Sequence, residues 1–345
     1  MKNFKKNLIL SIILSILVII FVFLISFFKE GFSITKINLN YLYLYISFLL
    51  ILLIWLFETI KLKILLNFFE INLSFFYLLY THLIGMFFST ITPLGIGGFA
   101  TKVYLISKKR NFDIGNIVSI FTYMYLINMF IYLFFSIILI FSFENLRETF
   151  ALKDRLIFFI ILFILLLSLL IFFITIKPEL FKKLSFLILS LFKKLSEDKR
   201  EKISNIINTN YERFVNGMKS ARKLKFKIIP IFVLTILSFF TLNSLSYFLL
   251  KTLNINSSYF NSFLLQFIYH FFTGWSVTPG GSGISEAIYT SLFITETSFS
   301  KIPHLLILFK FFTYYIYIFI GGILTFKELK SFLEINVLYE KSGDI

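Results

Sequence analysis

Two breaks rich in proline and glycine interrupt long apolar stretches of this sequence. Residues 92–98 read Thr-Pro-Leu-Gly-Ile-Gly-Gly, and residues 278–286 read Thr-Pro-Gly-Gly-Ser-Gly-Ile-Ser-Glu. The flanking stretches 75–91, 259–277 and 288–299 are strongly apolar. Backbone at the depth of a bilayer must satisfy its own polar groups, so a non-helical segment there has to be buried in protein or line a wet cavity. Two matching breaks in the two halves of a chain are typical of a substrate site made by discontinuous helices.

The composition is that of a polytopic membrane protein. Of the 345 residues, 58% are hydrophobic and 50 are phenylalanine, far beyond the apolar share of soluble domains. The formal charge of +16 would suggest nucleic acid in a soluble protein. Here most basic residues flank apolar runs, where they set orientation and meet anionic lipid, so we predict no nucleic-acid partner. The chain has no cysteine and only 3 histidines, and we predict neither a metal site nor a cofactor.

The basic residues between the apolar runs predict the topology. Lys2, Lys5 and Lys6 place the N-terminus in the cytoplasm, and residues 8–28 form a first transmembrane helix that is not cleaved. Further spans are predicted at residues 41–57, 114–143, 156–176, 228–250 and 305–326. The protein is then a multi-pass protein of the plasma membrane with both of its ends in the cytoplasm.

The first break is predicted to lie in a re-entrant hairpin. Residues 75–91 start from the inner side, and the basic cluster 108–110 also reads as inside. The return arm, residues 99–107, is too short to cross about 30 Å of hydrocarbon at about 1.5 Å per residue. Residues 259–299 form either a second re-entrant pair or a full hairpin. If they are re-entrant, the two breaks enter from opposite sides and form an inverted repeat near the midplane.

The loop 177–227 is predicted to be cytoplasmic, because it holds 14 Lys and Arg against 5 Asp and Glu. Apolar residues recur in it at helical spacing, namely Ile203, Ile206, Ile207, Tyr211, Phe214 and Met218. This helix either lies on the membrane surface or packs against the protein's own inner face. We predict one transmembrane domain over residues 1–345 with a cytoplasmic tail at 327–345. The fold class is an all-α integral membrane protein, a polytopic helical bundle with two broken or re-entrant hairpins in an inverted repeat.

The glycines of both breaks are candidates for anion binding. Helices that restart after Gly98 and Gly283 would point unpaired amides and the positive end of the helix dipole into the membrane interior, which suits a lipid phosphate. The alternative is that these glycines only let helices pack closely. The candidate headgroup-binding residues are Thr92, Pro93, Gly97, Gly98, Lys102, Thr278, Pro279, Gly280, Gly281, Ser282, Gly283, Glu286 and Lys310.

Glu286 is the carboxylate most suited to a functional role, because a charge at bilayer depth is functional by default. Helix capping together with Ser282 or Ser285 is the alternative. Its expected cationic partners are Lys310, in the middle of the last span, and Lys102, which alternatively extends to the cytoplasmic surface.

His82 and His270 each lie shortly before a break. They are candidates for a proton relay or for a hydrogen bond across helices. No Walker loop, dinucleotide fingerprint or nucleophile elbow occurs in the sequence, and we name no catalytic residue.

Both breaks carry recognisable motifs. Thr92-Pro93-x-x-x-Gly97-Gly98 followed by Val103-Tyr104-Leu105, and Thr278-Pro279-Gly280-Gly281-Ser282-Gly283-x-x-Glu286 with Phe293 beyond it, resemble a family's signatures. That family is the lysylphosphatidylglycerol synthase transmembrane (flippase-like) domain family. The resemblance covers nearly the whole chain, as far as Gly321-Gly322.

The resemblance implies a lipid translocator. In full-length relatives this domain moves aminoacylated phosphatidylglycerol to the outer leaflet, and a cytosolic acyltransferase-like domain makes that lipid from aminoacyl-tRNA. The loop 177–227 is too short and too basic for that second domain. We therefore expect a stand-alone translocator of an anionic or aminoacylated phospholipid such as lysylphosphatidylglycerol, linked to cell-envelope charge and resistance to cationic antimicrobial peptides.

Membrane phospholipid is the expected partner, and a separate aminoacyl-phospholipid synthase is a further candidate. In the expected mechanism, Glu286 and Lys310 form a charged pair or contact the lipid, and amides after Gly97 and Gly283 hold its phosphate. Two other functions stay open. One is a phosphatidylglycerol lysyltransferase or another headgroup transferase, and the other is a secondary transporter of a soluble anion.

Overall fold

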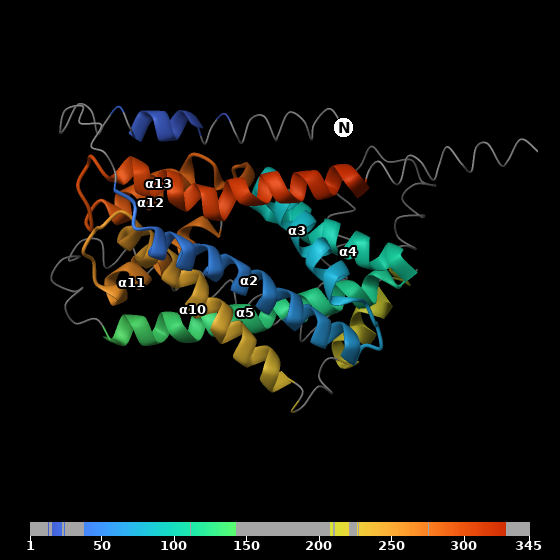
Figure 1. Cartoon of the computed structure of the whole chain (residues 1–345). Helices are drawn as coiled ribbons and strands as arrows, with labels where there is room; N and C mark the ends of the chain where they lie inside the picture. Colours follow the sequence, from blue (N-terminus) through green and yellow to red (C-terminus); the bar gives the residue numbers. More distant parts are fainter. Residues whose placement is uncertain are drawn as a thin grey trace, which may run out of the picture. The chain divides into compact units, whose positions relative to one another are not determined.

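The structure is a computed structural model of the whole chain (Figure 1). It describes residues 13, 16–22, 24, 38–110, 112–142, 208–209, 211–220, 226, 228–274 and 276–328. The principal helices in this part of the chain are α2 (Tyr41–Phe68), α3 (Phe75–Ile91), α4 (Ile96–Arg110), α5 (Ile114–Ser142), α10 (Ile229–Thr252), α11 (Tyr259–Thr273), α12 (Ile284–Phe293) and α13 (Ile302–Lys310). The short turns between or after them are η1 (Pro93–Gly95), η3 (Pro279–Gly281) and η4 (Phe311–Tyr315). The described residues contain no strand.

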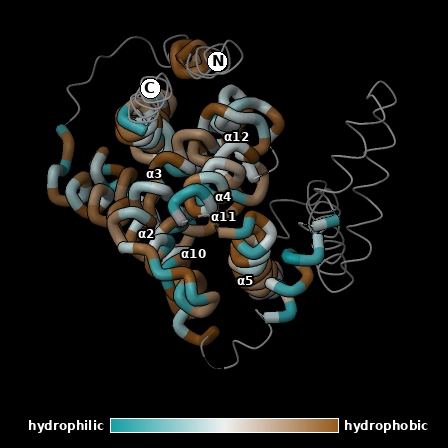
Figure 2. The backbone as a smooth tube through the Cα atoms, turned by 90° about the vertical axis from the view of Figure 1, so that its right-hand side faces the viewer, coloured by the Kyte–Doolittle hydropathy of each residue, from teal (hydrophilic) through white to brown (hydrophobic). Residues whose placement is uncertain are grey.

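Three of the described helices are long and apolar enough to cross a membrane. They are Ile114–Phe135, Ile229–Thr252 and Ile302–Glu328, the last of which begins with α13 and continues through η4. Figure 2 shows the hydrophobic colouring along α5. The predicted all-α integral membrane fold is confirmed, whereas the inverted repeat stays a prediction. Residues 156–176, most of 8–28 and most of the basic loop lie outside the described residues, as do residues 329–345.

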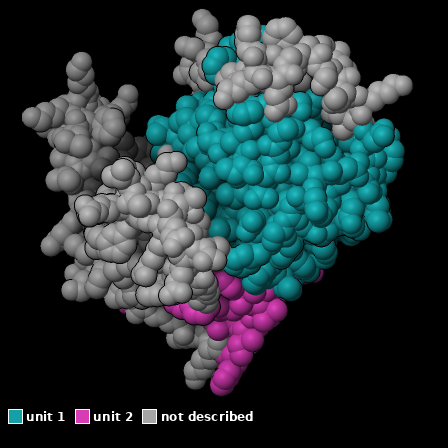
Figure 3. All heavy atoms as spheres, turned by 90° about the vertical axis from the view of Figure 1, so that its left-hand side faces the viewer, with its two compact units in different colours: residues 1–60, 73–105, 237–345 teal, residues 61–72, 106–236 magenta. Residues whose placement is uncertain are grey.

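The chain divides into two compact units, drawn in different colours in Figure 3. The first unit comprises Met1–Ile60, Leu73–Leu105 and Leu237–Ile345, and the second comprises Lys61–Asn72 and Ile106–Ile236. Both breaks, Glu286 and Lys310 belong to the first unit. That the chain functions as one transmembrane domain stays a prediction.

The core of the first unit is apolar and aromatic. Its buried residues come from α2, α3, α10, α11, α12 and the helix that begins with α13. Trp55 on α2 donates a hydrogen bond from Nε1 to the Tyr317 hydroxyl at 2.9 Å, which ties α2 to the last helix. Within a bilayer, helix association depends on van der Waals packing and on hydrogen bonds between helices. This core therefore fixes the helices that carry the second break.

The first hairpin consists of α3 and α4, which cross closely at glycines. Ser74 caps α3 by accepting a hydrogen bond from Tyr77 N at 3.3 Å. A Cβ atom at Gly98 would lie 2.5 Å from the Gly85 carbonyl oxygen, so the two helices approach too closely there for a side chain. The 15 residues of α4 reach about 22 Å, less than the hydrocarbon thickness of about 30 Å. The helix is longer than the predicted arm 99–107 but still has the length of a re-entrant arm.

The second hairpin consists of α11 and α12, which contact each other. The 15 residues of α11 reach about 22 Å and the 10 residues of α12 about 15 Å. Neither arm has the length of a full crossing. Of the two alternatives for residues 259–299, the re-entrant pair fits these lengths.

Two features of the second unit correct or refine the predictions. The helix α2 ends at Phe68 rather than at residue 57, and Lys61 within it is buried and donates from Nζ to Asn128 Oδ1 at 3.3 Å. An amide partner in the protein allows this lysine to stay in a continuous helix.

The predicted amphipathic helix of the basic loop is helical over residues 211–220. Phe214 and Met218 are buried. A Cβ atom at Gly217 would lie 2.0 Å from Ser119 Oγ on α5, so this stretch packs closely on α5. Arg213 and Asp113 add an ion pair of 2.7 Å whose side chains are about half exposed. For residues 211–220 the structure supports packing on the protein itself, the second of the two alternatives.

Candidate functional site

The two breaks have the same local backbone conformation. Each begins with an extended threonine, followed by a proline whose missing N–H suits the first position of a helical turn. The next residue has left-handed dihedral angles in both breaks, with φ 54° and ψ 10° at Leu94 and φ 61° and ψ 16° at Gly280. The glycines that follow, Gly95 and Gly281, have φ angles of 66° and 68°. The same turn conformation therefore occurs in both breaks, which lie far apart in the sequence.

The two breaks touch each other. Leu94 N donates to the Ser276 carbonyl oxygen at 3.3 Å, across the junction of the two hairpins. A Cβ atom at Gly280 would lie 2.3 Å from the Thr90 carbonyl oxygen and 2.6 Å from Tyr314 Cε2. A side chain at residue 280 would therefore push the second break away from the end of α3.

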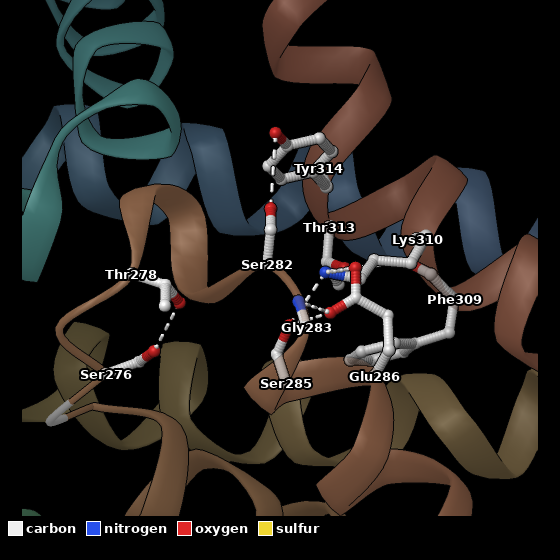
Figure 4. Close-up of polar contacts among 10 residues, drawn as sticks. All are labelled: Ser276, Thr278, Ser282, Gly283, Ser285, Glu286, Phe309, Lys310, Thr313 and Tyr314. Atoms are coloured by element: carbon white, nitrogen blue, oxygen red, sulfur yellow. Dashed lines mark hydrogen bonds and ion pairs between the residues drawn. The ribbon is translucent and has the colours of Figure 1, made fainter. Parts of the chain in front are cut away.

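Glu286 and Lys310 form an ion pair beside this junction (Figure 4). Lys310 Nζ lies 2.9 Å from Glu286 Oε1, and the exposed fractions of the two side chains are 3% and 0%. Glu286 lies in the first turn of α12, and Lys310 is the last residue of α13. The pair thus joins the helix that restarts after the second break to the last long helix.

The Glu286 carboxylate has two further donors. Gly283 N and Ser285 Oγ donate to its Oε2 atom at 2.7 Å and 2.8 Å. Gly283 has a φ angle of 88°, which side-chain-bearing residues rarely adopt, so glycine here lets the chain turn its amide toward the carboxylate. The carboxylate also caps α12, where the helix dipole favours negative charge. It is therefore held in place even without its lysine.

The Lys310 ammonium has three neighbours. Besides Glu286, its Nζ donates to Ser285 Oγ at 2.8 Å and lies 4.9 Å from the ring centroid of Tyr314, within cation–π range. Ser282 Oγ lies 3.5 Å from the Tyr314 hydroxyl, at the long limit of a hydrogen bond. The π-helical turn η4 directly follows Lys310 and contains Tyr314. Such turns are rare and are frequent at functional sites.

An aromatic stack packs α12 against α13 next to the ion pair. The rings of Tyr289 and Phe309 are parallel to within 13°, with centroids 3.9 Å apart. Phe293 stacks on the other side of Tyr289 at 4.4 Å, and Tyr269 meets Phe309 edge-on at 4.9 Å. Tyr289 lies three residues after Glu286, on the same face of α12. The ion pair is thus bordered by packed aromatic rings of α12 and α13.

Stability alone does not explain a buried ion pair. Desolvation of both charges offsets much of their attraction, and replacement of both by apolar residues is often neutral or stabilising. A single charge at bilayer depth costs roughly 2.5 to 3.5 kcal/mol on insertion scales. Ionisable residues inside membrane segments therefore point to a functional role, and we regard Glu286 and Lys310 as the centre of the candidate site.

A family model described as the lysylphosphatidylglycerol synthase TM region matches residues 8–321. The chain belongs to this family. The resemblance recognised from the motifs of the two breaks is thereby confirmed. Membership of the lysylphosphatidylglycerol synthase TM family and the apolar helices indicate a membrane protein with a lipid-related function. The orientation of the two chain ends in the membrane stays a prediction.

The lysylphosphatidylglycerol synthase TM family match is supported by a curated relative. The chain is 25% identical over 301 residues to a UPF0104 membrane protein from Archaeoglobus fulgidus, covering 85% of this chain and 88% of the relative. No solved structure matches the chain significantly.

The backbone amides of Gly97 and Gly283 themselves form hydrogen bonds within the protein. Gly97 N donates to Thr92 Oγ1 at 3.0 Å, and Gly283 N donates to Glu286 Oε2. Side-chain caps of this kind compete with a ligand for the first N–H groups of a helix, and the role of the amides after Gly97 and Gly283 in phosphate binding stays a prediction. The roles of Thr92, Pro93, Gly97 and Gly98 in headgroup binding stay predictions, as do those of Thr278, Pro279, Gly280, Gly281, Ser282 and Gly283.

The other predicted site residues lie in several places. The carbon chain of Lys102 packs over Gly85, where a Cβ atom would lie 2.4 Å from Lys102 Cε, so this lysine is part of the α3–α4 contact. His82 is buried on α3. His270 shares a hydrogen bond of 2.9 Å with Gln266 one turn earlier on α11, within its own helix rather than across helices. Among the described residues, no cluster of His, Asp and Glu could hold a metal ion.

Sequence reasoning missed Tyr314 and a buried polar chain next to the stack. Ser246 on α10 hydrogen-bonds to Gln266 and, at 2.9 Å, to the Tyr289 hydroxyl. The position of Tyr314, four residues after Lys310, was a usable signal, because residues at this spacing lie on one helix face. Nothing in the sequence indicated that Ser246 lies opposite Gln266 and Tyr289.

Proposed function

We propose that this protein moves a phospholipid, anionic or aminoacylated, between the two leaflets of the membrane. The observation that carries the proposal is the buried Glu286–Lys310 pair beside the contact between the two breaks. Lysylphosphatidylglycerol is the example that the family name suggests. A link to envelope charge and to resistance against cationic peptides would follow from movement of such a lipid.

A lipid translocator has to carry a charged headgroup through the apolar interior while the acyl chains stay in lipid. The headgroup therefore needs charged partners at that depth, and these must be screened from lipid when no headgroup is bound. Glu286 and Lys310 meet this need, because each neutralises the other in the closed arrangement. Two short hairpins that meet at their breaks give such a site a route from either side.

The test is leaflet exchange of labelled lipid in proteoliposomes. Phosphatidylglycerol and lysylphosphatidylglycerol, each with a fluorescent acyl chain, are followed by chemical quenching of the outer leaflet. The native protein is compared with empty vesicles, with Glu286→Gln and with Asp113→Asn. Asp113 is a matched control, because it forms a half-exposed ion pair with Arg213 instead of a buried one. We expect exchange by the native protein and Asp113→Asn, and loss of exchange in Glu286→Gln.

The opposite result identifies the competing functions. If folded native protein exchanges no lipid faster than empty vesicles do, the translocator is wrong. Product formation from a headgroup donor and lipid would then favour a transferase. Uptake of a soluble anion that does not depend on lipid headgroup would favour a secondary transporter.

A further inference from the structure

We infer that the Glu286–Lys310 site selects phospholipids whose headgroup is itself a neutral pair, with one phosphodiester and one primary ammonium group. The inference rests on the proposed movement of phospholipid between leaflets, and it goes beyond that proposal because the headgroup class that it names is zwitterionic. The bound headgroup takes the place of the ion pair, with its ammonium on Glu286 and its phosphate on Lys310. Each protein charge then exchanges one opposite charge for another.

Charge neutrality is the first argument. Glu286 and Lys310 together carry no net charge, and both are almost completely buried. A headgroup with only a phosphate would compensate Lys310 and leave Glu286 without a cation. A headgroup with two ammonium groups would leave one of them without an anion. Because an uncompensated charge at bilayer depth is costly, the headgroup with one charge of each sign fits the site.

Hydrogen bonding is the second argument, and it specifies a primary ammonium. The Lys310 ammonium forms an ion pair with Glu286 Oε1 at 2.9 Å and donates a hydrogen bond to Ser285 Oγ at 2.8 Å. A primary ammonium on a headgroup is the same chemical group, so it can both pair with the carboxylate and donate to Ser285 Oγ. A quaternary ammonium has no N–H, so it could pair with the carboxylate by charge alone and would leave Ser285 Oγ without this donor.

Glu286 and Lys310 each have a contact that can remain when a headgroup replaces the ion pair. Glu286 retains the amide of Gly283 through Oε2 when Lys310 leaves, so the carboxylate stays oriented toward the incoming ammonium. Lys310 lies over the ring of Tyr314, a contact that does not involve Glu286. A lysine is a compact charge with three donors, which suits a phosphate.

A purely structural pair is the competing explanation. In that explanation the ion pair would only stabilise the packing of α12 against α13, as the stack of Tyr289 on Phe309 already does. In that case the rate of exchange would not depend on the charge of the headgroup. The two explanations therefore predict different selectivity among lipid headgroups, which can be measured, and they do not differ in the stability that they predict for the protein.

The experiment uses the full-length protein in proteoliposomes and four lipids with the same fluorescent acyl chains. They are phosphatidylethanolamine, which is neutral with a primary ammonium; phosphatidylcholine, which is neutral with a quaternary ammonium; phosphatidylglycerol, which is anionic; and lysylphosphatidylglycerol, which has two ammonium groups. We expect phosphatidylethanolamine to exchange on the order of 100-fold faster than phosphatidylglycerol, the ratio that one uncompensated charge implies. It should also exchange faster than the other two lipids.

Two variants should change the preference for phosphatidylethanolamine. Glu286→Gln leaves only the cation, so the slow exchange that remains in this variant should favour phosphatidylglycerol over phosphatidylethanolamine. Lys310→Gln leaves only the carboxylate, and we expect its preference to move toward lysylphosphatidylglycerol. Asp113→Asn should keep the order of the native protein. A structural pair would instead give two variants that lose all four lipids equally.

The outcomes separate the two proposals. Equal exchange of all four lipids by native protein would overturn this inference and leave the translocator in place. No exchange of any lipid would overturn both. Uptake of soluble glycerophosphoethanolamine without lipid exchange would show that the site takes the free headgroup rather than the lipid, and would also overturn both. If a variant does not fold, the order of the four lipids in the native protein still decides.

Discussion

Gly280 lies directly against the carbonyl oxygen of Thr90. A Cβ atom there would be 2.3 Å from that oxygen, closer than any real contact, and the oxygen belongs to the backbone at the end of α3. Because backbone cannot move aside as a side chain can, the second break is seated on the first hairpin at a position that only glycine allows. The contact between the two breaks therefore depends on this residue.

Gly280→Ala should weaken this contact, and Gly281→Ala is its matched control. Both glycines have positive φ angles, 61° and 68°, so both substitutions carry the same cost of about 1 to 2 kcal/mol for left-handed backbone. At Gly281 the nearest atom to a new Cβ is 3.4 Å away, which is ordinary contact. Overpacking at Gly280 adds about 1 to 3 kcal/mol. Thermal unfolding followed by tryptophan fluorescence measures the difference, and equal midpoints for the two variants would contradict the observed contact.

Leu94→Gly should be neutral or stabilising. Leu94 occupies the position equivalent to Gly280 with a φ angle of 54°, and its side chain is 51% exposed. Glycine removes the strain of a left-handed leucine at the expense of more freedom in the unfolded chain, so we expect a change within about 1 kcal/mol. The same unfolding measurement applies. A large loss would mean that the Leu94 side chain makes contacts that its exposure does not suggest.

Replacement of the whole ion pair separates its contribution to the stability of the protein from its role in lipid exchange. Removal of one partner, as in Glu286→Leu or Lys310→Met, leaves a buried charge and should cost about 3 to 5 kcal/mol. The double variant carries no buried charge and should recover most of that loss. We expect the double variant to unfold near the native temperature and yet to exchange no lipid. A double variant with native exchange would show that the pair is not part of the site.

Local sequence rules predict the bounds of the first hairpin well. The helix α3 covers residues 75–91 as expected, because Ser74 caps its start and the proline at position 93 forces Thr92 into extended backbone. The partnership of Glu286 with Lys310 was also predictable, since few charges lie within apolar runs and each needs a partner. These features depend on neighbouring residues or on charge alone.

Contacts between distant segments could not be predicted in this way. That Leu94 bonds to Ser276, and that Gly280 fits against Thr90, follows from the packing of two hairpins, which no local pattern specifies. The extension of α2 past residue 57 was missed because the predicted span ended with the apolar run, which Glu58 and Lys61 interrupt. The burial of Lys61 depends on Asn128, which lies far along the chain.

Tyr314 should hold Lys310 through its ring rather than through its hydroxyl. The ring centroid lies 4.9 Å from Nζ, whereas the contact of the hydroxyl with Ser282 is a long 3.5 Å. We expect Tyr314→Phe to change stability by less than about 0.5 kcal/mol, and Tyr314→Leu to lose about 0.5 to 2 kcal/mol of cation–π attraction in addition to its packing. Lipid exchange should follow the same order. A loss in Tyr314→Phe equal to that in Tyr314→Leu would assign the role to the hydroxyl.

Tyr289 should stabilise the junction of α12 and α13 by stacking more than by hydrogen bonding. Its ring lies between Phe309 and Phe293, at 3.9 Å and 4.4 Å, and its hydroxyl reaches Ser246, which keeps Gln266 as a second partner. Tyr289→Phe removes one hydrogen bond and should cost about 1 kcal/mol. Tyr289→Ala leaves a cavity between the two rings and should cost about 3 to 5 kcal/mol. Since Phe309 precedes Lys310, the alanine variant should also disturb the ion pair and slow lipid exchange, whereas the phenylalanine variant should not. If Tyr289→Phe stopped exchange in a protein of nearly native stability, the polar chain through Ser246 would have to take part in transport.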